Sequence, residues 1–198
     1  MAKRRAVANL LALTVMAELV AEPMHPYEMG RRLKEHGKDR TVKYTRSSLY
    51  MVVEQLRKAG FVVEQETVRD TQRPERTVYA LTAEGRRELD DWMRELVAEP
   101  QPEHPKFGVA LSLLAVLTPA DAVELLNRRL TALGELATDA GEQLRLGAEQ
   151  NVPWIFLIEE EYRLGVLQAE QRFVTTLIES LDRPDYLRLW QEFFAGPN

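Results

Sequence analysis

The chain has 198 residues, of which 45% are apolar, and this is enough for one large or two small domains with hydrophobic cores. It contains no cysteine, which excludes disulfides, thiolate metal sites and cysteine nucleophiles and is typical of a reducing compartment, so we expect a cytoplasmic protein. The formal net charge of −5 argues against a generic nucleic-acid binder, although residues 1–99 carry +2 and residues 100–198 carry −7.

The first predicted helix spans residues 6–21, which are rich in Leu, Ala and Val. The basic residues before it are similar to the start of a signal peptide, but Glu18 and Glu22 interrupt the apolar run and no small-residue cleavage site follows. No uncharged apolar run has the length needed to span a bilayer. We therefore interpret the segment as a buried helix and expect no contact with a membrane.

A second helix is predicted from His25-Pro26 to about Gly37, because proline suits the first helical position. Its expected inward-facing residues are Tyr27, Met29, Gly30 and Leu33. A basic loop then leads to Tyr44. The balance between Arg31 and Lys58 is +6, which suits a phosphate backbone, although a solvated helix face would have a similar charge.

A third helix is predicted from Thr45 to Gly60, with the threonine as its cap and the glycine as its left-handed stop. Its buried stripe is Leu49, Val52, Val53 and Leu56, and this leaves the following residues pointing mostly outward: Arg46, Ser47, Tyr50, Glu54 and Lys58. A plain amphipathic surface helix would look similar. Three short helices with brief connections nevertheless have the spacing of a helix-turn-helix unit.

Two β-like runs, 61–68 and 77–81, follow the third helix and flank a charged connection, 69–76. After a three-helix unit this hairpin is interpreted as the wing of a winged helix, the alternative being an ordinary surface hairpin. A fourth helix begins after Thr82, and three prolines in residues 99–106 then form a stiff linker. The predicted domains are therefore 1–98, the linker 99–106, and 107–198.

The C-terminal domain is predicted to be helical, with a short apolar helix over 107–117, a long helix after Thr118-Pro119 and another after Pro153. The last of these has two apolar stripes. One stripe is Ile155, Ile158, Tyr162, Gly165 and Ala169, and the other is Leu157, Leu164, Leu167, Val174, Ile178 and Leu181. A neighbouring helix can cover only one of them, so we expect a two-fold homodimer, unless the terminal helix from Pro184 folds back over the second stripe.

Several motifs resemble those of PadR-family transcriptional regulators of the long form. They are His25-Pro26-Tyr27-Glu28, Ser48-Leu49-Tyr50, Ala59-Gly60-Phe61-Val62, the run 78–85 and, in the C-terminal half, the runs 111–119 and 157–164. The resemblance implies a mainly α fold, with a winged helix-turn-helix and a two-stranded wing joined to an antiparallel long-helix dimerisation domain. It also implies a dimer that binds an inverted-repeat operator in double-stranded DNA, usually as a repressor that a small molecule or stress signal releases.

The predicted DNA contacts lie on the second helix, the basic loop after it, the third helix and the wing. They are Arg31, Arg32, Lys43, Tyr44, Thr45, Arg46, Ser47, Tyr50, Arg73 and Arg76. The third helix would enter a major groove with Arg46 and Ser47 near the base edges, because a recognition helix leads with its first residues. Ser48, Met51 and Arg57 depart from the family pattern, and Arg57 is expected to add positive charge.

An effector pocket is predicted from five aromatic residues: Trp92, Phe107, Trp154, Phe156 and Tyr162. Core packing is the common alternative for aromatic residues at helical spacing. We expect no enzyme, cofactor or metal site, because the sequence has no GxGxxG, P-loop or HExxH pattern and its three histidines are not spaced as a cluster. A winged-helix adaptor that binds protein and not DNA is the alternative function.

Overall fold

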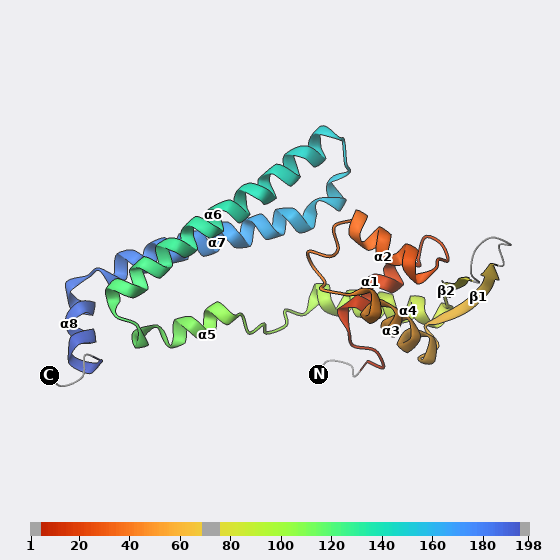
Figure 1. Ribbon diagram of the computed structural model, residues 1–198, viewed down its shortest axis with the longest axis horizontal. Coiled ribbons are helices and arrows are strands. Elements are labelled where there is room, and N and C mark those ends of the chain that lie inside the picture. Colours follow the sequence, from red (N-terminus) through yellow and green to blue (C-terminus); the bar gives the residue numbers. More distant parts are fainter. Residues whose placement is uncertain (1–4, 69–75, 195–198) are drawn as a thin grey trace. The chain divides into compact units, whose positions relative to one another are not determined.

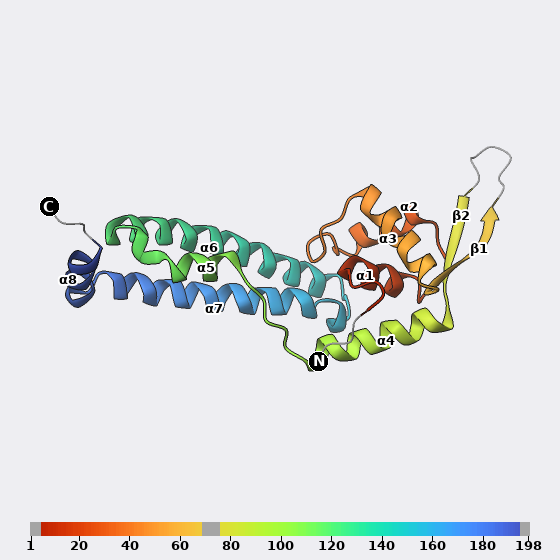
Figure 2. The same cartoon turned by 90° about the horizontal axis from the view of Figure 1, so that it is seen from below.

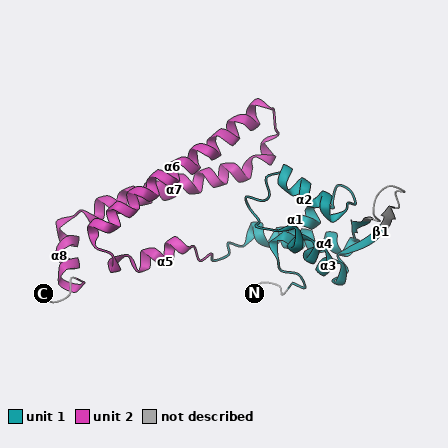
Figure 3. Cartoon of the chain, in the orientation of Figure 1, with its two compact units in different colours: residues 1–102 teal, residues 103–198 magenta. Residues whose placement is uncertain are grey.

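The computed structural model describes residues 5–68 and 76–194. The chain divides into two compact units, Met1–Pro102 and Glu103–Asn198 (Figure 3), and the division lies within the proline-rich segment 99–106. The fold class expected from the sequence is confirmed: helices dominate, and the two strands form one antiparallel hairpin (Figure 1). None of the described helices combines the length and apolar character needed to cross a membrane.

The first unit begins with three short helices: α1 (Leu10–Glu18), α2 (Pro26–Glu35) and α3 (Arg46–Lys58). Helix α1 is shorter than the predicted 6–21, because the Asn9 side chain accepts the Leu11 N–H and so caps the helix at that point. Helix α2 ends just before Gly37, whose φ of +68° supplies the left-handed stop.

The hairpin follows as β1 (Val62–Val68) and β2 (Arg76–Leu81), which pair in antiparallel register with an irregularity between Glu64 and Glu66. A single backbone bridge joins Met24, just before α2, to Tyr79 of β2 through two hydrogen bonds of 3.0 and 3.1 Å. Strand β2 of the wing is therefore hydrogen-bonded to Met24, just before the start of α2. The sequence did not predict this backbone pairing.

Helix α4 (Ala83–Ala98) completes the unit, and its Thr82 cap accepts the Gly85 N–H as expected. Helix α1 packs against both α3 and α4, and Figure 2 shows these two helices on different sides of it. The core consists of buried residues from all these elements, among them Leu11, Val15, Met29, Leu33, Leu49, Val52, Leu56 and Trp92. Burial of this set fixes the position of α3 on the unit.

The second unit is a long antiparallel helix pair with short helices beside it (Figure 2). Its elements are α5 (Lys106–Ser112), the 3-10 turn η1 (Leu114–Val116), α6 (Pro119–Glu149), the 3-10 turn η2 (Trp154–Phe156), α7 (Ile158–Leu181) and α8 (Pro184–Phe193). The apolar segment 107–117 is therefore not one helix, as predicted, because α5 ends at Ser112 and a 3-10 turn follows. Helix α7 likewise begins after a 3-10 turn and not directly at Pro153.

The two apolar stripes of α7 have different surroundings within the chain. The stripe that contains Val174 and Leu181 is buried against α6, in a core that includes Ala122, Leu126 and Leu133. The other stripe, with Ile155, Ile158, Tyr162, Gly165 and Ala169, is exposed. Helix α8 packs instead near the end of α7, where Trp190 donates to the Ala115 carbonyl at 3.0 Å. Among the described residues of the second unit, no other helix covers this stripe.

Candidate nucleic-acid interface

Helix α3 begins with a reciprocal cap. The Thr45 hydroxyl accepts the Ser48 N–H at 3.1 Å, and the Ser48 hydroxyl accepts the Thr45 N–H at 2.8 Å. The four residues of the predicted stripe are all buried, and Gly60, with φ +77°, ends the helix region. The third helix is therefore confirmed in its boundaries and in the face that it buries, and its opposite face is available to a partner.

Close packing holds α3 beside α2. A Cβ built on Gly30 would lie 3.1 Å from Leu49 Cδ2, so the glycine permits the approach. Tyr44, in the connection between the helices, donates its hydroxyl to the Gly30 carbonyl at 3.1 Å. Burial of this side chain raises the pKa of Tyr44, and the nearby Asp39 carboxylate raises it further. Tyr44, predicted as a DNA contact, thus has a structural role in this packing.

The exposed face of α3 is led by Arg46, its first residue, followed by Ser47 and by Tyr50 one turn later. These three residues and Thr45 line an open depression of about 640 Å³. The Arg46 guanidinium carbon lies 5.9 Å from the ring centroids of both Tyr27 and Tyr50. The structure therefore brings four predicted site residues together, and it adds Tyr27.

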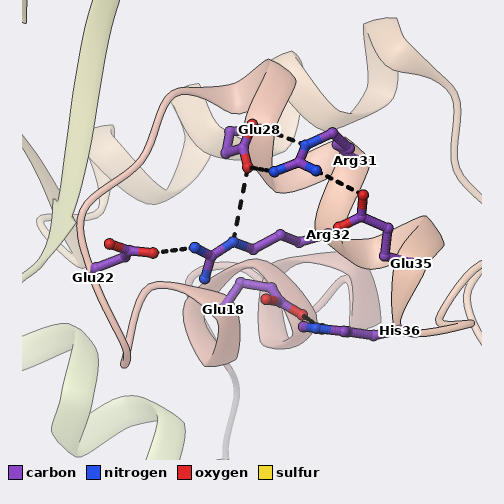
Figure 4. Close-up of polar contacts among 7 residues, drawn as sticks. All are labelled: Glu18, Glu22, Glu28, Arg31, Arg32, Glu35 and His36. Atoms are coloured by element: carbon purple, nitrogen blue, oxygen red, sulfur yellow. Dashed lines mark hydrogen bonds and ion pairs between the residues drawn. The ribbon is translucent and has the colours of Figure 1, made fainter.

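Arg31 and Arg32, predicted as DNA contacts, lie in a network of carboxylates on and beside α2 (Figure 4). Arg31 pairs with Glu28, and also with Glu35 at 2.7 Å. Arg32 pairs with Glu22, and its Nε lies 3.9 Å from Glu28. The Arg31 hydrogen bond lowers the pKa of Glu28, so this carboxylate stays ionised. Both arginines are therefore paired with carboxylates within the chain, and their contact with DNA stays a prediction.

Arg57 is also paired, although the sequence suggested that it adds positive charge to α3. Its Nε lies 2.7 Å from Glu54 and 3.7 Å from Glu64, and Lys58 also faces Glu54 at 3.6 Å. The hydrogen bond from Arg57 lowers the pKa of Glu54 to about 2, so the carboxylate is ionised at neutral pH. The end of α3 is thus close to neutral, and the positive charge is concentrated at its beginning.

The other predicted contacts lie in the loop and the wing. Lys43 is exposed just before α3. Arg76 is the first residue of β2, and Arg73 lies outside the described residues. Within residues 5–68 and 76–194, no group of three His, Asp or Glu side chains is placed to hold a metal ion.

The five aromatic residues predicted for an effector pocket have different surroundings. Trp92 is buried in the core of the first unit, with the Arg5 guanidinium 5.0 Å from its ring. In the second unit, Phe107 packs against the core and under Arg129, whose guanidinium lies 3.6 Å from the ring centroid. Trp154, Phe156 and Tyr162 are exposed. Trp154 donates to Glu161 at 3.1 Å.

Tyr27 and His25 belong to the neighbourhood of Arg46, but the sequence did not place them there. Tyr27 was expected to face inward, yet its side chain is 57% exposed, so this expectation was wrong. The inward residues of α2 are Pro26, Met29 and Leu33. Helical spacing could have predicted the outward position of Tyr27. Successive helix residues are about 100° apart around the axis, so Tyr27 lies about 100° from Pro26 and still farther from Met29.

The first unit of the chain matches a known protein family in sequence. Residues 15–91 match the family described as "Transcriptional regulator PadR-like family". Bacillus subtilis PadR in complex with operator DNA is similar in structure, with 19% sequence identity, a TM-score of 0.67, and 88% of this chain and 100% of that chain covered. No curated protein matches the chain in sequence.

Two further solved structures are similar along most of the chain. The Vibrio cholerae virulence activator AphA has 16% identity and a TM-score of 0.65, with 87% of this chain and 98% of that chain covered. Bacillus subtilis PadR in complex with p-coumaric acid has 18% identity and a TM-score of 0.59, with 84% and 99% covered. At these identities the likeness establishes a shared fold.

Proposed function

We propose that this chain, of which residues 15–91 match the PadR-like family of transcriptional regulators, is a sequence-specific, dimeric DNA-binding regulator without enzymatic activity. It acts in the cytoplasm on an inverted-repeat operator as a repressor, and a small molecule or stress signal releases it. The Bacillus subtilis PadR of similar fold is solved with operator DNA, which supports DNA as the partner.

The observation that carries this proposal is the beginning of α3. There, Arg46 and Ser47 are exposed at the leading end of a helix whose other face is anchored in the core. A helix of this kind enters a major groove with its first residues at the base edges, where arginine donates to guanine. Tyr50 and Lys43 would contact phosphates, and the wing residues Arg73 and Arg76 would contact the backbone or minor groove.

Replacing Arg46 with alanine is expected to weaken specific DNA binding by about 1–3 kcal/mol, because it removes a charged base contact. Fluorescence anisotropy with the DNA upstream of the chain's own coding region measures this change. The matched control is Arg87→Ala, which removes one positive charge from α4, where Arg87 pairs with Glu84. It should leave affinity nearly unchanged.

Salt dependence separates this function from the adaptor alternative. A DNA-binding regulator loses affinity steeply as salt rises, because phosphate contacts release counterions. A wild-type chain that binds no duplex even at low salt would be an adaptor. If wild type and Arg46→Ala instead bind DNA with equal affinity and sequence preference, Arg46 is not part of the interface.

The homodimer forms through the C-terminal helices. Support comes from the exposed apolar stripe of α7 and from Val166 beside it, which is 47% exposed in the single chain. Apolar side chains in a continuous row are typical of a surface that a second subunit covers.

Val166→Glu is therefore expected to shift the protein from twice the chain mass towards the 22.7 kDa of one chain in sedimentation equilibrium. A carboxylate in a closed apolar interface is costly, whereas in the monomer it would be solvated. Thr175→Glu places the same charge nine residues farther along α7, at an exposed position on the opposite side of the helix, and should leave the mass unchanged. A dimeric Val166→Glu protein would place the interface elsewhere.

The effector is proposed to be a small aromatic compound bound by Trp154, Phe156 and Tyr162 of the second unit, whose side chains are exposed. The Bacillus subtilis PadR of similar fold is solved with p-coumaric acid, so this compound is the first one to test against the operator complex.

A further inference from the structure

Arg46 occupies a position that does not favour helix stability. It is the first residue of α3, where the partial positive charge of the helix terminus opposes a cation. Throughout the part of the chain that the structure describes, Arg46 has no carboxylate at ion-pair distance, in contrast to Arg31, Arg32 and Arg57. Its charge is therefore available to a partner.

Two tyrosine rings accompany this guanidinium. Tyr27 comes from α2 and Tyr50 from α3, and each ring centroid lies 5.9 Å from the Arg46 guanidinium carbon. This distance lies within the range of about 6 Å over which a cation is attracted to an aromatic ring. A guanidinium that rests against ring faces still presents its N–H edges to acceptors.

His25, which precedes α2, contacts the backbone of Tyr27 and the ring of Tyr50. Its Nδ1 accepts the backbone N–H of Tyr27 at 3.1 Å, which fixes the first turn of α2. The His25 ring meets the Tyr50 ring edge to face, with centroids 6.1 Å apart and planes at 76°. The beginnings of α2 and α3 are thus linked through three side chains around Arg46.

Tyr27 is not needed for the core. The buried residues of α2 are Pro26, Met29 and Leu33, while the Tyr27 ring is 57% exposed beside Arg46. A large apolar ring is kept at the surface here, so its contact with Arg46 can be removed without opening a cavity.

We propose that Tyr27 is a positioning residue that, together with Tyr50, holds the Arg46 guanidinium in the orientation that contacts DNA. The inference rests on the proposed DNA-binding function. Holding the long arginine side chain in place before binding reduces the conformational entropy lost in the complex. Tyr27 acts through Arg46 and makes no contact with DNA itself.

The test is a double-mutant cycle on the full-length protein, read by anisotropy with the upstream DNA. Tyr27→Leu should weaken binding about two- to five-fold, since it removes one cation–ring contact at an exposed site. Tyr27→Phe should bind like wild type, because the ring remains. In the Arg46→Ala background, Tyr27→Leu should have no further effect.

A second measurement does not depend on DNA. Ring currents should move the Arg46 side-chain proton signals upfield in the NMR spectrum of the free protein, and Tyr27→Leu should reduce that shift while Tyr27→Phe preserves it. Unfolding curves of both variants should overlay that of the wild type, because the ring is exposed.

The outcomes are distinguishable. A wild type that binds no duplex overturns the proposed function and this inference together. A wild type that binds DNA, with Tyr27→Leu equal to it, overturns the inference alone. The inference also fails if Tyr27→Phe loses as much affinity as Tyr27→Leu, or if Tyr27→Leu still weakens binding without Arg46, because Tyr27 would then touch DNA directly.

Discussion

Gly85→Ala is expected to destabilise the N-terminal unit by about 3 kcal/mol, because the new methyl group has no space. A Cβ at this position would lie 2.1 Å from the Phe61 carbonyl oxygen and 2.8 Å from Leu81 Cδ1. The first of these is a backbone atom, so a change of side-chain rotamer cannot relieve the contact. Helix α4 would have to move away from Phe61, which lies between α3 and β1.

Hydrogen bonds of Thr82 hold both Gly85 and the Phe61 carbonyl in place. Thr82 donates its backbone N–H to the Phe61 carbonyl at 3.0 Å and its hydroxyl to the Gly60 carbonyl at 2.8 Å. The same hydroxyl accepts the Gly85 N–H at 2.9 Å. Moving α4 therefore breaks the cap of that helix as well as the connection to the wing.

Urea unfolding followed by circular dichroism measures the loss. The control is Gly141→Ala on α6, where a Cβ would meet nothing within 4 Å. That change should be neutral or stabilise the protein by up to about 1 kcal/mol through helix propensity. A Gly85→Ala protein as stable as the wild type would mean that α4 adapts without loss of these hydrogen bonds.

Arg5→Leu should destabilise the same unit by about 3 kcal/mol, because it removes the cation from a buried ion pair. The Arg5 side chain is only 4% exposed, and its Nη1 lies 2.5 Å from Glu88, itself 8% exposed. It also pairs with Glu95, and its guanidinium lies 5.0 Å from the Trp92 ring. The substitution leaves two carboxylates in a poorly hydrated place without the cation that faces them.

The same urea experiment tests this expectation. Arg87→Ala is the matched control on α4, because Arg87 and its partner Glu84 are both largely exposed, and such a pair contributes less than about 1 kcal/mol. Combining Arg5→Leu with Glu88→Leu should recover part of the loss, since only the more exposed Glu95 carboxylate then lacks the Arg5 cation. Equal stability of Arg5→Leu and wild type would show that water reaches the carboxylates.

The third helix could be predicted from the sequence because its determinants are local. Thr45 and Ser48 cap one another within a single turn, and the buried stripe repeats every three or four residues until Gly60. The ion pairs of Arg31 could also be predicted from the sequence, since Glu28 lies three residues before it and Glu35 four residues after it on the same helix. The pairing of Arg32 with Glu22, which lies in the connection before α2, could be known only from the folded structure.

The sequence by itself thus determined most of the helices, the wing hairpin and the leading position of Arg46, because caps, turns and periodicity act over one or two turns of chain. Only the tertiary structure decided the surroundings of these elements: Arg5 against Glu88, Phe61 against Gly85, and Tyr27 beside Arg46. These contacts join segments 19 to 83 residues apart, and which side chains meet depends on the packing of whole helices. Packing therefore sets which arginines stay free for a partner.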